Sequence, residues 1–162
     1  MLLSLLPSIV VLGLAATAAI ALALTRTSQT EHTAQRREAA NALALALILQ
    51  GIHFAEEALT GFPERLAQLL DLPAMPMSFF VVFNVTWLGI WVVSIPGIRS
   101  AHTGAFFAAW FLAIAGIING VAHPLLAVAS GGYFPGLVSS PFIAVAAIWL
   151  WQRLSRATLS RS

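Results

Sequence analysis

Five long apolar stretches constrain the fold of this chain more than any other feature of its sequence. They cover residues 2–24, 39–59, 77–97, 104–129 and 137–151. A helix needs about 20 mainly apolar residues to cross the hydrocarbon core of a bilayer. The first four stretches reach that length, and the fifth is shorter. The pattern predicts an all-α integral membrane bundle of five transmembrane helices.

The composition agrees with a membrane protein and excludes several other classes. Charged residues make up only 9% of the chain and hydrophobic residues 59%, whereas soluble domains carry about 25% charged residues. The absence of cysteine excludes disulfides and thiolate metal sites. The net charge is only +2, and no dense basic patch is interleaved with aromatics, so nucleic acid is not an expected partner. The expected partner is the lipid bilayer.

The distribution of arginines predicts how the chain is oriented. With five spans, the arginines on one side are Arg26, Arg36, Arg37, Arg99, Arg153, Arg156 and Arg161, and Arg65 alone is on the other. Loops rich in basic residues stay on the cytoplasmic side of the membrane. We therefore expect the N-terminus outside, the C-terminus in the cytoplasm, and a multi-pass protein of the plasma (inner) membrane.

The segment between the second and third predicted spans has helical periodicity of its own. It reads "GFPERLAQLLDLP", with leucines on one side and polar residues such as Glu64 and Arg65 on the other. Pro63 is well suited to the first turn of a helix. The pattern predicts a short amphipathic helix on the outer membrane surface. An ordinary connector with a polar face is the alternative.

Polar residues gather on two of the predicted membrane helices. His53, Glu56 and Glu57 are spaced i, i+3 and i+4, so they share one helix face, and Asn119 and His123 are spaced i and i+4. His53 lies about 21 Å along a hydrocarbon core of about 30 Å. In the predicted orientation, both sets therefore lie toward the outer leaflet. Asn84 on the third predicted span falls in the same half.

Each of these residues also has a structural interpretation. Glu57 is near the end of its helix and can reach the interface, and Asn119 can hydrogen-bond a neighbouring helix. Gly116 and Gly120 are typical of close helix packing. However, a charged residue at the centre of a span costs about 2.5–3.5 kcal/mol and is by default a functional candidate. Because two histidines and two glutamates share a depth, the pattern favours a shared functional site over a purely structural hydrogen-bond network.

The loop before the fifth span has two interpretations. It reads "SGGYFPG", at residues 130–136, and the helix after it is short for a bilayer. If the loop dips inward to meet that helix, it brings Tyr133 toward the polar cluster, and such irregular backbone is tolerated only over a protein cavity. A simple turn made by two glycines and a proline fits the residues equally well.

Three motifs along the chain resemble those of a known family. They are "HFAEE" at residues 53–57, "NGVAH" at 119–123 and "YFPG" at 133–136. In this order they resemble the HxxEE, NxxxH and YxPG motifs of the HXXEE family of small bacterial membrane proteins. The resemblance implies which residues matter but implies no activity. It divides the chain into a first helix and loop (1–38), an HXXEE-like four-helix membrane domain (39–152) and a basic cytoplasmic tail (153–162).

Two imidazoles and two carboxylates are a plausible ligand set for Zn²⁺, Fe²⁺ or Mn²⁺. The candidate metal ligands are His53, Glu57, His123 and Asn119. One glutamate would serve as a ligand and the other as a general base, so Glu56 and Glu57 are both catalytic candidates. Tyr133 or Asn119 would stabilise an oxyanion. The spacing matches neither the HExxH motif of zincins nor the Glu-x-x-His motif of di-iron bundles, which favours a mononuclear site.

These residues support three functional hypotheses. The first is a metal-dependent membrane enzyme, hydrolase-like and with Zn or Fe, that acts on a lipid-like substrate entering from the outer leaflet. The second is a non-catalytic protein whose His/Glu/Asn network fixes helix packing or binds a ligand. The third is a proton-coupled or cation transporter. The third is the weakest, because the cytoplasmic halves of the predicted helices carry no comparable polar residues.

Overall fold

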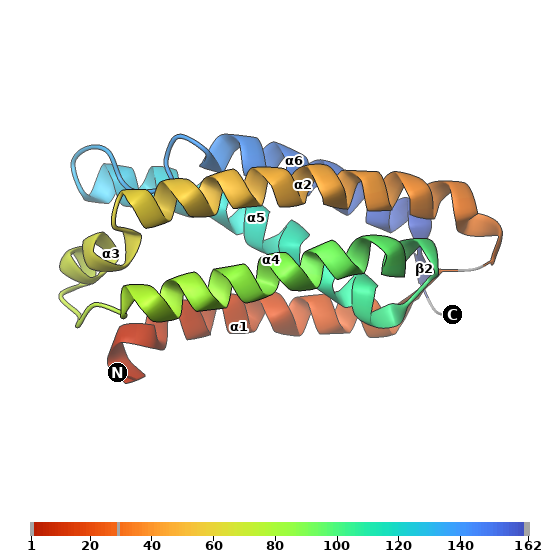
Figure 1. Cartoon of the computed structure of the whole chain (residues 1–162), viewed down its shortest axis with the longest axis horizontal. Helices are drawn as coiled ribbons and strands as arrows, with labels where there is room; N and C mark the ends of the chain where they lie inside the picture. Colours follow the sequence, from red (N-terminus) through yellow and green to blue (C-terminus); the bar gives the residue numbers. More distant parts are fainter. Residues whose placement is uncertain (1, 29, 161–162) are drawn as a thin grey trace.

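The computed structural model of the protein describes residues 2–28 and 30–160. Within these residues the chain forms six α-helices, one short 3-10 helix and a pair of two-residue strands (Figure 1). In chain order the elements are α1 (Leu2–Thr25), β1 (Arg26–Thr27), η1 (Thr30–His32), α2 (Thr33–Leu59), α3 (Phe62–Leu70), α4 (Met77–Arg99), α5 (Thr103–Ala129), α6 (Ser140–Ala157) and β2 (Leu159–Ser160). The prediction of an all-α fold is confirmed.

Five long helices run side by side along the molecule, and the short α3 closes one end (Figure 1). Helix α5 packs against α1, α4 and α6, while α2 packs against α4 and α6. The buried side chains of α5 are mostly alanines and aromatic rings. Small residues allow helix backbones to approach closely, and aromatic rings fill the remaining space. Helix α5 is therefore the centre of the bundle, and the other long helices surround it.

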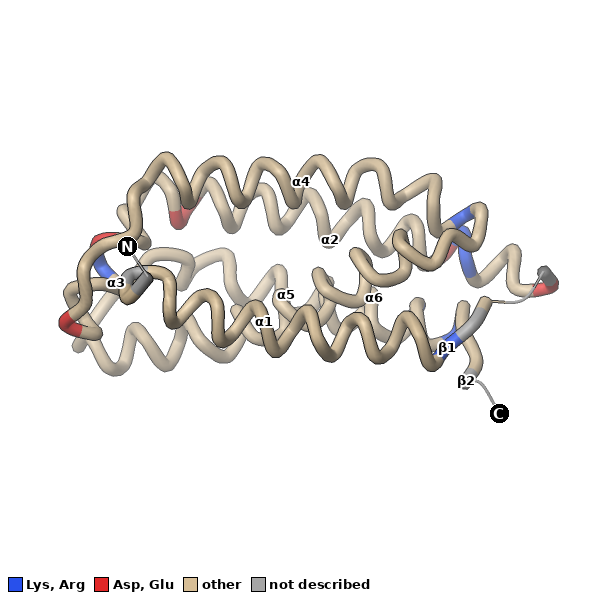
Figure 2. Tube along the Cα trace, turned by 90° about the horizontal axis from the view of Figure 1, so that it is seen from below, with Lys and Arg blue, Asp and Glu red and all other residues tan. Residues whose placement is uncertain are grey.

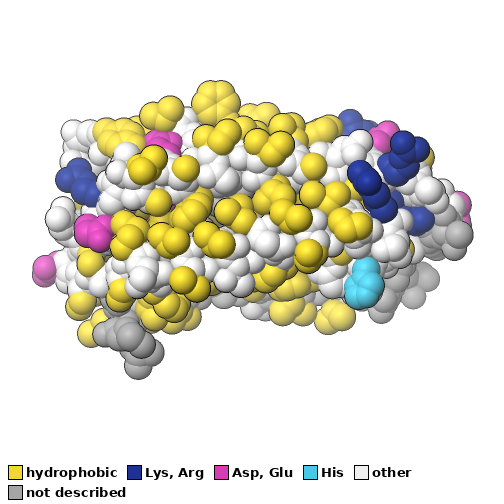
Figure 3. All heavy atoms as spheres, viewed as in Figure 1, with side chains coloured by type: hydrophobic (Ala, Val, Ile, Leu, Met, Phe, Trp, Pro, Cys, Tyr) yellow, Lys and Arg dark blue, Asp and Glu magenta, His cyan; other side chains and the backbone are white. Residues whose placement is uncertain are grey.

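Four of the helices are long and apolar enough to cross a membrane. Among the described residues these are α1, α2, α4 and α5. Helix α6, which contains most of the fifth predicted span, has 18 residues and is not among the four. Figure 3 shows hydrophobic side chains over the middle of one face, with most charged side chains near the two ends. The structure thus agrees with a membrane protein, whereas the number of spans and their orientation stay predictions.

Arginines gather at the end of the bundle opposite α3 (Figure 2). Two of them hold helix C-termini, where backbone carbonyls lack helical partners. Arg26 donates hydrogen bonds to the carbonyls of Ser155 and Thr158 at the end of α6, and to the Thr158 hydroxyl, each at 2.9 Å. Arg36 donates to the carbonyl of Arg99 at the end of α4. Cations at helix C-termini are favourable because of the helix dipole, so these arginines fasten neighbouring helices together at this end.

The predicted close packing at Gly116 and Gly120 is confirmed, and it joins α5 to α6. A Cβ atom added at Gly116 would lie 2.7 Å from Cβ of Ala147, and one added at Gly120 would lie 2.3 Å from Cβ of Ala144. Both distances are too short for carbon atoms in contact. Each glycine is therefore required for α6 to lie this close to α5, which matters because both helices border the site described below.

We expect Gly120→Ala to destabilise the protein. Overpacking of a tight contact costs about 1–3 kcal/mol, which exceeds the gain of up to about 1 kcal/mol that alanine brings inside a helix. Thermal unfolding of the purified protein in detergent measures the difference. Gly51→Ala on α2 is the matched control, because nothing lies within 4 Å of its added Cβ. If the two variants proved equally stable, Gly120 would not be needed for the packing of α5 on α6.

The amphipathic helix predicted after the second span is present as α3. It begins after Gly61, which has a φ of 76°, and Pro63 lies in its first turn, as the sequence suggested. Pro63 and Ala67 are buried against the bundle, whereas Glu64 and Arg65 are exposed. The left-handed conformation at Gly61 is unfavourable for residues with a Cβ atom. This glycine therefore allows the chain to turn sharply from α2 into α3 across the end of the bundle.

Candidate metal centre

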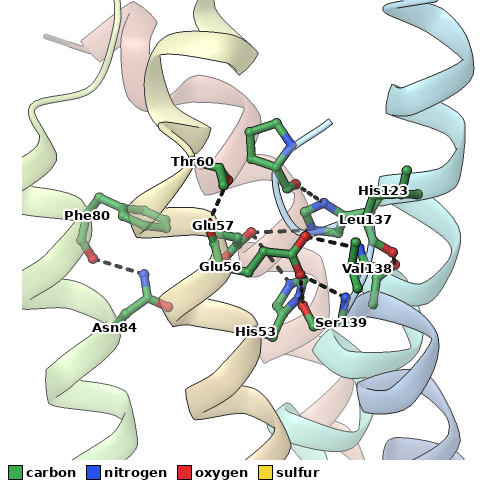
Figure 4. Close-up of polar contacts among 12 residues, drawn as sticks. His53, Glu56, Glu57, Thr60, Phe80, Asn84, His123, Leu137, Val138 and Ser139 are labelled. Carbon is green, nitrogen blue, oxygen red and sulfur yellow. Dashed lines mark hydrogen bonds and ion pairs between the residues drawn. The ribbon is translucent and has the colours of Figure 1, made fainter. Parts of the chain in front are cut away.

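Three of the predicted site residues come together inside the bundle, near the end that α3 closes. His53 and Glu57 lie one turn apart on α2, and His123 lies on α5 (Figure 4). All three are buried, with exposed fractions of 0%, 6% and 2%. One potential ligand atom from each residue lies within 4.8 Å of the others. The group could hold a metal ion, and we call it the His/Glu centre.

The hydrogen bond of His123 determines which of its ring nitrogens carries a proton. Its Nδ1 atom lies 2.6 Å from the carbonyl oxygen of Pro135. A carbonyl can only accept, so Nδ1 must donate its proton. In a neutral imidazole the other nitrogen, Nε2, then has a free lone pair. That nitrogen faces Glu57, with 3.4 Å between Nε2 and the carboxylate Oε1.

His53 is held in the same way through a side chain rather than a carbonyl. Its Nδ1 atom lies 2.8 Å from the hydroxyl oxygen of Ser139, and that hydroxyl donates a short hydrogen bond to Glu56. Because the single hydroxyl proton of Ser139 goes to a carboxylate, its oxygen accepts the proton on Nδ1 of His53. The Nε2 atom of His53 lies 3.6 Å from Oε1 of Glu57. Among the described residues this buried nitrogen has no hydrogen-bond partner.

With both rings neutral and the carboxylate ionised, the centre brings together three atoms that accept and none that donates. The two Nε2 atoms face one carboxylate oxygen, and the two rings are in a T-shaped arrangement with 4.7 Å between centroids. Buried acceptors that face one another without a hydrogen between them are unfavourable. A bound cation would satisfy all three. Histidines that bind metals commonly donate their other N–H to a carbonyl or a carboxylate-linked group, as both do here.

The loop between α5 and α6 turns inward and forms one wall of the centre. Phe134 and Pro135 are fully buried, although they lie in irregular backbone. Gly136 has a φ of 87°, and a Cβ added there would lie 2.4 Å from Cε1 of His123 and 2.9 Å from Cε1 of His53. The sequence left a plain turn and an inward loop equally open. The structure has the inward loop, and only a residue without a Cβ atom can lie this close to both rings.

Aromatic rings cover the centre on the side of α3. The ring of Phe62 lies 5.6 Å from that of His123 and 5.9 Å from that of Phe134, measured between centroids. Phe80 on α4 stacks on Phe62 at 5.8 Å. The three phenylalanines come from α3, α4 and the loop between α5 and α6, so tertiary packing is needed to assemble them. They limit the access of water to the imidazoles, which strengthens electrostatic interactions inside the centre.

The first glutamate of the motif, Glu56, points away from the imidazoles and toward the loop. Glu56 accepts hydrogen bonds from the Tyr133 hydroxyl at 2.8 Å, from the backbone N–H groups of Val138 and Ser139 at 3.0 and 2.8 Å, and from the Ser139 hydroxyl. Burial and the neighbouring Glu56 carboxylate raise the pKa of Tyr133 above its ordinary value, so the phenol keeps the proton that it donates. Glu56 thus fastens α2 to the start of α6.

The remaining polar candidates lie outside the group of three. Asn119 is half-buried on α5, one turn before His123, and it is not among the residues whose ligand atoms converge. Asn84 donates to the carbonyl of Phe80 in its own helix, at 2.9 Å. Gln50 is buried one turn before His53, and its side-chain oxygen has no hydrogen-bond partner within the described part of the chain. The structure brings Tyr133 to Glu56 rather than to the imidazoles.

A comparison with protein families agrees with these motifs. Residues 43–150 match a family described as "Protein of unknown function with HXXEE motif". The chain belongs to the HXXEE family. No curated protein and no solved structure matches it. The three motifs that characterise this HXXEE protein in sequence meet at one place in the structure, since each contributes a side chain, a carbonyl or a glycine to the His/Glu centre.

Two contributors to the centre of this HXXEE protein were not predicted from its sequence. Ser139 lies outside all three motifs, and serines before a proline-containing helix start are common, so nothing marked it as special. The carbonyl of Pro135 is a backbone group, and a sequence pattern does not show where a carbonyl points. The only available signal was the "YFPG" motif, which contains Pro135 and ends three residues before Ser139.

Proposed function

We propose that this HXXEE protein is a metal-dependent integral membrane enzyme with hydrolase-like chemistry. His53, Glu57 and His123 would hold a single Zn²⁺ or Fe²⁺ ion. The substrate would be lipid-like and would reach the centre from the outer leaflet. The proposal includes the five-span topology, with the N-terminus outside and the C-terminus in the cytoplasm.

The observation that carries the proposal is the convergence of three acceptors without a donor. Both imidazoles present an Nε2 lone pair to Oε1 of Glu57, at 3.6 and 3.4 Å. Each Nδ1 is committed to another partner, Ser139 or Pro135. Two neutral imidazoles and one carboxylate are a ligand set found in catalytic zinc sites and in non-haem iron sites. Flipping either imidazole ring would not remove the unfavourable contact between its Nε2 and Glu57 without cost, because the flip would break the hydrogen bond of its Nδ1.

The geometry supports different roles for the two glutamates. Glu57 faces the imidazoles and would be the ligand, whereas Glu56 accepts four hydrogen bonds from the loop and the start of α6. A carboxylate with that many donors is a weak base. His53, Glu57 and His123 would hold the ion, and a metal bound there would supply the chemistry that activates water in hydrolases.

The position of the centre supports a substrate that comes from the membrane. The centre lies near the α3 end of the bundle, away from the arginine-rich end. In the predicted orientation that end belongs to the outer leaflet. Apolar side chains such as Val121 and Leu125 are exposed on α5 on either side of His123 in sequence, as on a surface that faces lipid. A lipid-like substrate would therefore approach through the membrane rather than from water.

The first experiment measures metal content. The protein is purified in mild detergent without added metal or chelator, and bound metals are quantified by mass spectrometry. We expect near-stoichiometric Zn or Fe in the wild type and none in His53→Ala or His123→Ala. His102→Ala is the control, because this histidine is exposed and lies at the other end of α5. A wild type that stays metal-free after supplementation with Zn²⁺ and Fe²⁺ would overturn the metal-dependent function.

A second candidate function rests on the same distances. If one imidazole carried two protons, its Nε2–H and the Glu57 carboxylate would form a buried ion pair at 3.4 or 3.6 Å. The centre would then be a non-catalytic network that fixes α2 against α5. The metal measurement separates the two functions, since a network that is closed by a proton has no place for a cation.

A further inference from the structure

Glu56 has no place among the ligands, yet it is the most hydrogen-bonded side chain of the site. We propose that Glu56 acts through Ser139 to determine which ring nitrogen of His53 carries the proton. In this role both are positioning residues, and Glu56 is not a catalytic base. The expected effect on metal affinity rests on the proposed function, whereas the expected position of the proton on the His53 ring does not.

The first step is the fixed direction of the hydrogen bonds at Glu56. An ionised carboxylate accepts and cannot donate. Its Oε1 accepts from Tyr133 and from the backbone N–H of Val138, and its Oε2 accepts from the backbone N–H and the hydroxyl of Ser139. Four donors from one loop therefore hold the carboxylate in a single orientation. They also keep it beside α6, where an anion near the helix N-terminus is favourable.

The second step is that the direction of the Ser139–Glu56 hydrogen bond determines the direction of the hydrogen bond between Ser139 and His53. The Ser139 hydroxyl has one proton, and the carboxylate takes it. Its oxygen then has only lone pairs to offer to His53, whose Nδ1 lies 2.8 Å away. His53 must place its proton on Nδ1, which leaves Nε2 bare. Ser139 is 7% exposed and His53 is fully buried, so bulk water does not offer the ring an alternative partner.

The third step links this ring to the docking of the loop. Glu56 holds Tyr133, Val138 and Ser139, and the same loop supplies the Pro135 carbonyl that fixes His123. When the loop packs against the bundle, it therefore orients both imidazoles. It orients His53 through Ser139 and Glu56, and His123 through the Pro135 carbonyl. This arrangement explains why the HXXEE motif has two adjacent glutamates. One faces the imidazoles, and the other holds the loop that orients them.

The test reads the protonation of each ring nitrogen directly, by ¹⁵N NMR of metal-free protein labelled at histidine. Protonated and unprotonated imidazole nitrogens have well-separated chemical shifts. We expect His53 of the wild type to carry its proton on Nδ1. In Ser139→Ala the partner is gone, and in Glu56→Gln the amide can donate to the Ser139 oxygen, whose proton then turns to His53. In both variants we expect His53 to shift toward a proton on Nε2.

His123 is the internal control in the same spectra. Its Nδ1 donates to the Pro135 carbonyl, so Ser139→Ala should leave it unchanged. An unchanged His123 also shows that the variant is folded around the site. Two results would overturn the proposal. One is a wild-type His53 with its proton on Nε2, and the other is a His53 that keeps its proton on Nδ1 in both variants.

Metal affinity gives a second readout and separates this proposal from the proposed function. We expect Ser139→Ala and Glu56→Gln to bind Zn²⁺ about 10–100-fold more weakly than the wild type, as when an outer partner of a metal-binding histidine is lost. If the wild type bound no metal but the His53 proton moved as described, only the metal-dependent function would fail. If metal bound and the proton stayed on Nδ1 in both variants, only the role of Glu56 and Ser139 would fail.

Discussion

Replacing Glu57 with glutamine is expected to abolish metal binding and, at the same time, to make the metal-free protein more stable. The Glu57 Oε1 atom lies 3.6 and 3.4 Å from the two Nε2 atoms, and neutral rings that carry their protons on Nδ1 cannot donate to it. A glutamine has nearly the same shape, and its NH₂ group can donate to both nitrogens. Two new hydrogen bonds of about 1 kcal/mol each would raise the melting temperature by about 4–8 °C.

Two measurements check the Glu57 prediction, namely metal content and thermal unfolding in the presence of a chelator. Glu64→Gln on α3 is the matched control, because this glutamate is exposed. It should change neither quantity. A Glu57→Gln variant that is less stable than the metal-free wild type would mean that the carboxylate is paired with a charged imidazole. That outcome would favour the non-catalytic network over the metal centre.

Replacing Gly136 with alanine is expected to disrupt the centre more than any other change of one methyl group. The added Cβ would lie 2.4 and 2.6 Å from Cε1 and Nδ1 of His123, and 2.9 Å from Cε1 of His53. The left-handed φ of 87° costs an alanine about 1–2 kcal/mol, and the overpacking costs about 1–3 kcal/mol more. Both rings must move, so metal affinity should fall by about 100-fold or more.

Gly132→Ala is the matched control for this prediction, because it lies in the same loop and nothing is within 4 Å of its added Cβ. Zinc titration and thermal unfolding of both variants give the comparison. The two substitutions add the same atom to the same loop, and they differ in what that atom meets and in the left-handed φ at Gly136. Equal zinc affinity in the two variants would show that Gly136 does not pack tightly against the imidazoles.

The three motifs of the family all contribute to the same site in this structure. The HxxEE motif supplies His53 and Glu57 from one helix face, together with Glu56, which turns toward the loop. The NxxxH motif supplies His123. The YxPG motif supplies a hydroxyl for Glu56, a carbonyl for His123 and a glycine that packs close to both rings. A change in any one motif is therefore expected to affect the residues of the others.

The membrane helices and the polar residues of the HxxEE motif could be predicted from the sequence, because each depends on a local pattern of residues. Apolar length marks membrane helices, and the spacing of His53, Glu56 and Glu57 places them on one helix face whatever the rest of the chain does. The four long apolar helices and the amphipathic α3 follow from the same local patterns.

The role of each residue was decided by the tertiary structure. Glu56 and Glu57 are chemically identical neighbours, and about 100° of rotation around the helix sends one to the loop and the other to the imidazoles. Ser139 and the Pro135 carbonyl enter the site because the loop packs inward. Ser139 there meets His53, which lies 86 residues earlier in the chain, and the Pro135 carbonyl meets His123, which lies 12 residues earlier. Side-chain chemistry and local periodicity thus determined which residues this protein can use. Only long-range packing determined which nitrogen faces which carboxylate, because hydrogen-bond direction depends on partners that sequence spacing does not specify.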